Sequence, residues 1–145
     1  MRSAGVALLM PSASLVLYTG TMTSAHALIV DDERDIRELL SLSLGRMGLS
    51  AATAGTLAEA KALLDTQRFD ICLTDMRLPD GNGLALIEHA VRHFPHMPIA
   101  MVTAFGDVQS AVGALKAGAF DFVSKPVDLG ELRQIVQRGL LLGAN

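Results

Sequence analysis

Four short apolar segments of this 145-residue chain each end in side chains that can do chemistry. The residues are Asp31 with Asp32, Asp75, Thr103 and Lys125. If the segments are strands of an open parallel sheet, the loops at their carboxyl ends share one crevice. Three carboxylates, a hydroxyl and an ammonium group would then meet at one point. That combination suits a divalent cation and a phosphoryl group.

The elements that must position these residues alternate along the chain. Short apolar runs predict strands at 26–30, 50–54, 70–74, 98–103 and 120–124. Segments of helical periodicity predict helices at 34–47, from Thr56 onward, 83–93, 107–117 and 129–142. Such alternation indicates an α/β fold in which helices connect the strands of a parallel sheet. Right-handed crossovers and one change of direction give a doubly wound, flavodoxin-like (βα)5 sheet of five strands in the order 2-1-3-4-5.

Two longer strings carry a resemblance to a known family. They are TDMRLPDGNG at 74–83 and LKAGAFDFVSKPVDL at 115–129. Together with the two early aspartates and the threonine, in this order and spacing, they resemble the receiver domains of two-component response regulators. The resemblance runs from about His26 to Leu141. It is nearest to the nitrogen-regulation family of sigma-54-dependent activators, and within that family to the type IV pilus regulators.

The resemblance implies a role for each acidic residue. Asp75 is the expected phosphoacceptor. Asp32 and Asp75 are expected to bind Mg²⁺ directly, with Mn²⁺ as a substitute, while Asp31 acts through water and the backbone carbonyl of Arg77 completes the protein ligands. Elementary electrostatics agrees, because adjacent acids repel one another and raise a pKa unless a cation lies between them. Ordinary explanations also exist: an aspartate can cap a helix or form a turn, and Glu33 is expected to be a first-turn residue of the first helix.

The remaining site residues are expected to respond to the phosphoryl group. By resemblance, Lys125 precedes a cis bond to Pro126 that aims its ammonium into the crevice, and Thr103 is the hydroxyl switch. Ala104 leaves room for the phosphoryl group, and Phe122 is the aromatic residue that moves with the threonine. A solvated lysine and a core phenylalanine are the plain alternatives. His89 and His93 have a metal-ligand spacing. The helix at 83–93 is expected to face inward through Leu84, Ile87, Ala90, Val91 and Phe94, which excludes both histidines and favours a solvated face.

The function implied is a phosphorelay signalling module and not an enzyme in the usual sense, although it assists its own phosphorylation and dephosphorylation. A cognate sensor histidine kinase is the expected donor. The response is expected at the fourth helix, fifth strand and fifth helix, with a homodimer forming on activation. Contact with DNA and sigma-54 polymerase would need domains following Asn145, and a freestanding receiver is the alternative. A cytoplasmic protein without membrane contact is expected.

Two other classes of protein share parts of this pattern. A flavodoxin-type cofactor binder needs a loop rich in Ser, Thr or Gly after the first strand, where Asp31, Asp32 and Glu33 would repel a phosphate. A phosphohydrolase of the haloacid dehalogenase type needs a second aspartate two residues after the nucleophile, where this chain has Arg77. Both alternatives are therefore weaker than the receiver interpretation.

Composition and charge narrow the classes of function that are possible. There are 12 Lys and Arg residues against 15 Asp and Glu residues, without a basic stripe, so nucleic-acid binding by this chain itself is disfavoured. The single cysteine, Cys72, excludes an internal disulfide and is expected to be a small buried hydrophobe. Residues 1–23 are expected to be an unstructured leader or the result of a misassigned start. Residues 24–145 are expected to be the receiver domain.

Overall fold

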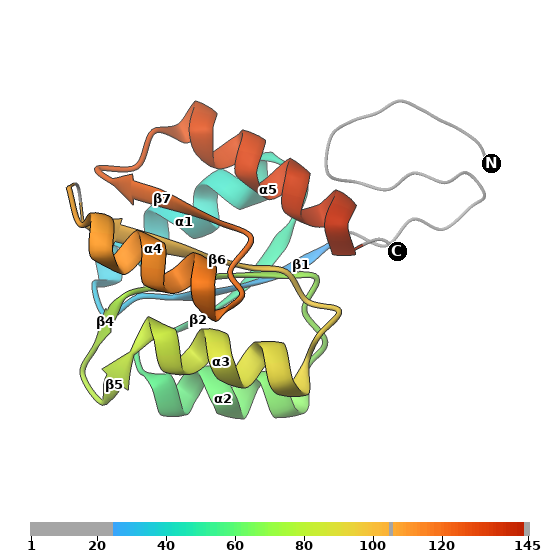
Figure 1. Ribbon diagram of the computed structural model, residues 1–145. Coiled ribbons are helices and arrows are strands. Elements are labelled where there is room, and N and C mark those ends of the chain that lie inside the picture. The colour runs from blue at the N-terminus through green and yellow to red at the C-terminus, as the bar shows by residue number, and fades with distance from the viewer. Residues whose placement is uncertain (1–24, 105, 144–145) are drawn as a thin grey trace.

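Five parallel strands form the central sheet of the computed structural model, which describes residues 25–104 and 106–143 (Figure 1). The strands are β1 (His26–Val30), β2 (Ser50–Ala54), β3 (Ile71–Asp75), β6 (Ile99–Ala104) and β7 (Asp121–Lys125). Their order is β2-β1-β3-β6-β7, which confirms the predicted order and the doubly wound fold. The predicted leader at 1–23 lies outside the described residues.

Five helices cover the two faces of this sheet. They are α1 (Arg34–Arg46), α2 (Leu57–Thr66), α3 (Gly83–His93), α4 (Val108–Ala117) and α5 (Leu129–Gly143). The core divides accordingly: α1 and α5 pack on one face, and α2, α3 and α4 pack on the other (Figure 1). Within the described ranges, none of these helices has the length and apolar character needed to cross a membrane.

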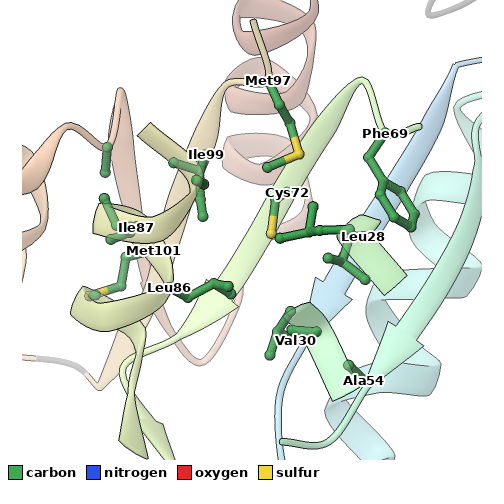
Figure 2. Close-up of a cluster of buried hydrophobic side chains, with 14 of the residues drawn as sticks. Leu28, Val30, Ala54, Phe69, Cys72, Leu86, Ile87, Met97, Ile99 and Met101 are labelled. Carbon is green, nitrogen blue, oxygen red and sulfur yellow. The ribbon is translucent and has the colours of Figure 1, made fainter. Parts of the chain in front are cut away.

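The three inner strands are buried on both faces, as expected for a parallel sheet between helices. Every residue of β3 is buried, and Ala27 to Val30 of β1 are at most 1% exposed. Cys72 lies among apolar side chains that include Leu28 and Met97 (Figure 2). Burial raises the pKa of its thiol, so Cys72 is a buried, unreactive side chain.

Helix ends follow local signals in the sequence. The Thr56 hydroxyl accepts a hydrogen bond from the Glu59 backbone N–H at 3.0 Å and so caps the start of α2. The Glu59 carboxylate in turn accepts from the N–H of Gly55 at 2.7 Å. Gly48 follows α1 with a φ of 93°, a left-handed conformation that a glycine adopts without strain.

Several boundaries differ from the sequence prediction. The last three strands of the sheet begin and end one residue later than predicted, so that Asp75 and Lys125 are the final residues of β3 and β7. Both were expected to follow their strands, because polar residues are typical of loops, yet backbone pairing continues through them: Asp75 pairs with Val102 and Lys125 with Ala104.

A short antiparallel ladder was not predicted. β4 (Arg77–Leu78) pairs with β5 (Gly81–Asn82) between β3 and α3. The inward face of α3 also differs from the prediction. Leu86 is fully buried whereas Val91 is 45% exposed, because α3 packs against α2 and α4 as well as the sheet and its buried stripe is turned accordingly.

Candidate functional site

Three aspartates lie together at the carboxyl ends of β1 and β3. Asp31 and Asp32 directly follow β1, and Asp75 ends β3. One carboxylate oxygen from each residue lies within 4.8 Å of the other two. Asp31 and Asp75 are buried, whereas Asp32 is exposed. Because β1 and β3 are parallel neighbours in the sheet, their pairing is what brings the three carboxylates to one point.

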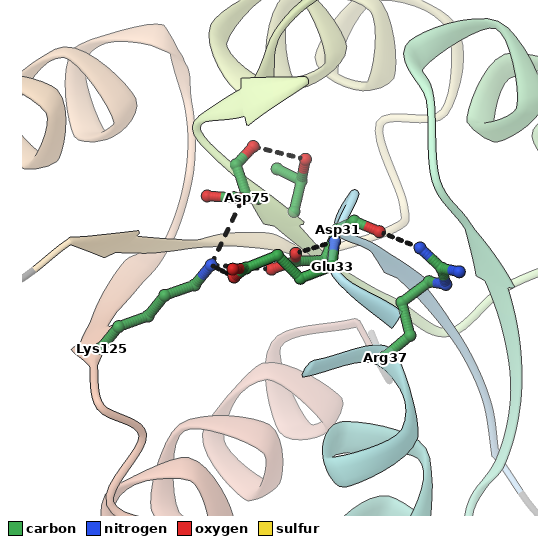
Figure 3. Close-up of polar contacts among 6 residues, drawn as sticks. Asp31, Glu33, Arg37, Asp75 and Lys125 are labelled. Carbon is green, nitrogen blue, oxygen red and sulfur yellow. Dashed lines mark hydrogen bonds and ion pairs between the residues drawn. The ribbon is translucent and has the colours of Figure 1, made fainter. Parts of the chain in front are cut away.

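The ammonium group of Lys125 lies against the carboxylates of Asp31 and Asp75 (Figure 3). Its Nζ is 3.0 Å from Oδ2 of Asp31 and 3.3 Å from Oδ2 of Asp75. The bond between Lys125 and Pro126 is cis, as the resemblance implied. β7 lies two strands away from β3, so a long side chain is needed to reach Asp75 from this position.

The charges in this cluster shift the pKa of Asp75 and the pKa of Lys125. Burial raises the pKa of the Asp75 carboxyl, the charge of Asp31 raises it further, and Lys125 opposes both effects. For Lys125, burial acts to lower the pKa, but the hydrogen bond to Asp31 and the charges of Asp75 and Asp31 outweigh it, so the pKa is raised. The lysine therefore stays protonated. One ammonium against three carboxylates leaves a net negative site that favours a cation.

Two residues join this site that the sequence interpretation had not placed there. Glu33 occupies the N-cap position of α1, one position before the first turn where it was expected, and its side chain makes no capping hydrogen bond. Its carboxylate lies 3.3 Å from Lys125 Nζ instead. Arg37 donates a hydrogen bond from Nη1 to the backbone carbonyl of Asp31 at 2.8 Å (Figure 3). The acidic run Asp31-Asp32-Glu33 was the available signal for Glu33. Arg37 gave no signal, because its contact depends on the turn between β1 and α1.

Thr103 and Ala104 lie at the end of β6, directly beside β3. Thr103 is 1% exposed, and its hydroxyl has no hydrogen-bond partner among the described residues. It follows Val102, the residue that pairs with Asp75, and Ala104 beyond it is exposed. A buried hydroxyl without a partner is costly. Thr103 therefore carries an unsatisfied polar group on the strand next to the one that carries Asp75.

Phe122 lies away from the charged cluster. It is partly buried on β7, pairs with Met101 of β6, and packs against the core under α2, α3 and α4. The structure therefore places it as a core residue of the strand that carries Lys125, and not as a member of the acidic site.

Two sets of contacts fix the backbone conformation of the segment after Asp75. Gly83 donates its N–H to the carbonyl of Met76 at 2.7 Å, and a Cβ at Gly83 would lie only 2.3 Å from the carbonyl oxygen of Asp75. Asp80 accepts hydrogen bonds from the first two backbone N–H groups of α2, at 2.7 and 2.9 Å. Arg77 lies between these points on β4, with an exposed side chain.

The donor set fits a small, hard cation. Carboxylate and backbone carbonyl oxygens are the ligands that Mg²⁺ prefers, with water and phosphate oxygens filling the other positions. Asp31, Asp32 and Asp75 are the residues that would hold it, and Asp32 and Ala104 at this edge of the sheet are exposed. The same negative charge disfavours the phosphate cradle of a flavin-binding protein.

Comparison with known proteins gives a consistent family. Residues 27–137 match the model of the response regulator receiver domain. The response regulator protein PilR of Pseudomonas aeruginosa is 55% identical over 121 residues, covering 83% of this chain and 27% of that protein. The DNA-binding transcriptional regulator NtrC of Klebsiella pneumoniae is 38% identical over 119 residues, covering 82% and 25%. This chain therefore spans about a quarter of the length of these curated relatives.

Solved structures agree with this result. The crystal structure of the receiver domain of NtrX from Brucella abortus is 32% identical and superposes with a TM-score of 0.76, covering 79% of this chain and 98% of that one. A putative response regulator from Chloroflexus aurantiacus is 31% identical with a TM-score of 0.78, covering 81% and 98%.

Proposed function

The chain belongs to the family of response regulator receiver domains, and from this premise we propose that Asp75 accepts a phosphoryl group from a sensor histidine kinase. The observation that carries the proposal is the meeting of Asp75 with two further aspartates and a lysine. Their oxygens lie within 4.8 Å of one another, and Lys125 Nζ lies 3.3 Å from Asp75. A carboxylate attacks a phosphoryl group readily only where neighbouring groups neutralise the charge on the donor. Lys125 supplies one positive charge here, and a cation held by the three aspartates would supply more.

The proposed transfer is a single displacement at phosphorus. An oxygen of the Asp75 carboxylate forms a bond to phosphorus, and the bond from phosphorus to the imidazole nitrogen of the kinase breaks, with that nitrogen taking up a proton. Lys125 stabilises the negative charge on the phosphoryl oxygens. Mg²⁺, when held by Asp31, Asp32 and Asp75, would neutralise charge on the same oxygens. The cap formed by Asp80 and the close packing at Gly83 hold the Asp75 backbone in position.

The proposed response begins at Thr103. The acyl phosphate would bring new acceptor oxygens next to a buried hydroxyl that has no hydrogen-bond partner in the described part of the chain. A hydrogen bond to a charged group is worth ~1.5–3 kcal/mol, and Thr103 and Lys125 can each provide one. Moving a two-state equilibrium from 1:99 to 99:1 takes ~5.5 kcal/mol, so the two bonds supply most of it. Phe122 and Lys125 share β7, which would transmit the change to the surface formed by α4, β7 and α5.

The wider role rests on the relatives. PilR is a response regulator and NtrC a DNA-binding transcriptional regulator, and this chain aligns with about a quarter of each. We propose that the chain is the phosphorylated control module of a sigma-54-type transcription activator. In this role it would act through a homodimer, with contact to DNA and polymerase made by other domains.

Phosphorylation can be tested with a small phosphodonor. Incubation with acetyl phosphate and Mg²⁺ should add one phosphoryl group per chain by mass spectrometry, and Asp75→Asn should add none. Asp65→Asn is a matched control, because Asp65 is an exposed aspartate of α2 that lies outside the acidic cluster. Normal labelling of the Asp75→Asn protein would remove Asp75 from its proposed role.

A further inference from the structure

Two histidines form a pair on the outer surface of α3. His89 and His93 are one helical turn apart, and their ring centroids lie 4.7 Å from each other with a tilt of 48°. His93 is exposed, so its ring can turn without disturbing the core. The pair belongs to no part of the acidic site.

His89 differs from the solvated residue expected from the sequence. It is partly buried, and its Nε2 is buried with no hydrogen-bond partner in the described part of the chain. Burial lowers the pKa of its imidazole, and the positive field of His93, Lys61 and Arg92 adds to this, against the opposing charge of Asp65. The ring is therefore neutral at pH 7, with one nitrogen that a ligand could satisfy.

The pair is well separated from the aspartates. Gly83, where α3 begins, contacts the backbone of Asp75. At ~1.5 Å of rise per residue, His89 lies about 9 Å and His93 about 15 Å further along the helix axis. A cation bound to the histidines would thus occupy a separate site.

We propose that His89 and His93 bind a transition-metal cation of the Zn²⁺ class through their imidazole nitrogens. Two histidines four residues apart on a helix present both rings to one ion, and imidazole is a preferred ligand of zinc but not of magnesium. Asp65 of α2 acts on His89 as a nearby negative charge and favours the cation, while Lys61 and Arg92 disfavour it. These opposing charges give the site a modest affinity. The ion would bridge two side chains one turn apart on α3, with water in the remaining coordination positions.

Zinc titration of the whole protein tests this proposal. Isothermal titration calorimetry should be run with Mg²⁺ in large excess, so that the acidic cluster is occupied. One zinc ion per chain should bind to the wild type, and His93→Ala should weaken binding roughly tenfold or more, since loss of even a supporting group costs that much. His93 is exposed, so this variant keeps the fold. His96→Ala is the matched control, because His96 is an exposed histidine three residues away that should not contribute.

Histidine ring resonances in NMR provide a second readout. The sequence has four histidines. Zinc should shift the ring signals of His89 and His93 and leave those of His26 and His96 in place. Equal zinc affinity in the wild type and His93→Ala, or zinc shifts spread evenly over all four rings, would overturn the proposal. Neither result would bear on Asp75, whose phosphorylation is measured separately.

Discussion

Replacing Thr103 with valine should separate phosphorylation from the conformational response. Valine keeps the shape of the side chain and removes only the hydroxyl. Thr103 is 1% exposed, and its hydroxyl finds no partner among residues 25–104 and 106–143, so its removal relieves an unsatisfied polar group. Such a group costs ~1–3 kcal/mol, and the unmodified variant should be at least as stable as the wild type.

The cost should appear only in the phosphorylated state. Losing a hydrogen bond to a charged oxygen costs ~1.5–3 kcal/mol, which changes the equilibrium between the two conformations roughly 10- to 150-fold. A population that is about 99% switched in the wild type would fall to between about 90% and 40% in the variant. Labelling of Asp75 by acetyl phosphate should continue, because the nucleophile, the metal ligands and Lys125 are all retained.

Hydrogen exchange with a beryllium fluoride mimic of the phosphoryl group measures this response. The wild type should change protection between residues 106 and 125, and Thr103→Val should change it less. Thr103→Ser keeps the hydroxyl and should behave as the wild type. Thr74→Val is a matched control on the neighbouring strand: its hydroxyl donates to the Asp75 carbonyl at 3.0 Å, so it should lose about 1 kcal/mol of stability but keep the response. Equal responses in wild type and Thr103→Val would show that the switch runs elsewhere.

Further variants test the parts of the site separately. Asp32→Ala should fold normally because the residue is exposed, yet lose both the rise in melting temperature caused by Mg²⁺ and labelling by acetyl phosphate. Gly83→Ala should lower stability by ~1–3 kcal/mol and slow labelling, because its Cβ would lie 2.3 Å from the Asp75 carbonyl oxygen. Gly45→Ala in α1 is its control, because no described atom lies within 4 Å of the added Cβ. Alanine is the better helix former, so this variant should gain roughly 0.5 kcal/mol of stability, and a loss would contradict the expectation. Asp80→Ala should lower the melting temperature and speed hydrogen exchange at the start of α2; unchanged exchange there would refute its capping role.

The sequence was most informative where chemistry and topology coincide. Polar residues at the ends of apolar runs predicted which side chains would meet, because parallel strands place their carboxyl ends at one edge of the sheet. The structure brings Asp31, Asp32, Asp75 and Lys125 together accordingly. Strand ends were misplaced by one residue for the same reason: polarity was taken to mark a loop, while backbone pairing continued through Asp75 and Lys125.

Contacts that depend on tertiary placement left no such pattern. The cap that Asp80 provides to α2 joins residues more than 20 positions apart, and its sequence context indicates only a turn. The contact between Glu33 and Lys125 joins residues that are 92 positions apart in the sequence. His89 was placed on a solvated face because the apolar stripe of α3 was drawn through Val91 instead of Leu86. Each of these depends on how neighbouring helices pack, which local periodicity does not specify.

The two sides of the candidate site rest on unequally packed parts of the fold, and this determines where a new charge would act. Asp75 stands on β3, in which every residue is buried, and the segment after it is held at Gly83. Lys125 stands on β7, an edge strand with one fully buried residue, Val123. α4, which contacts β7, buries only two small residues. Sparse apolar burial marks the segments that rearrange at least cost. A phosphoryl group on Asp75 that attracts Lys125 and Thr103 should therefore move β7 and α4 and leave β1 and β3 in place.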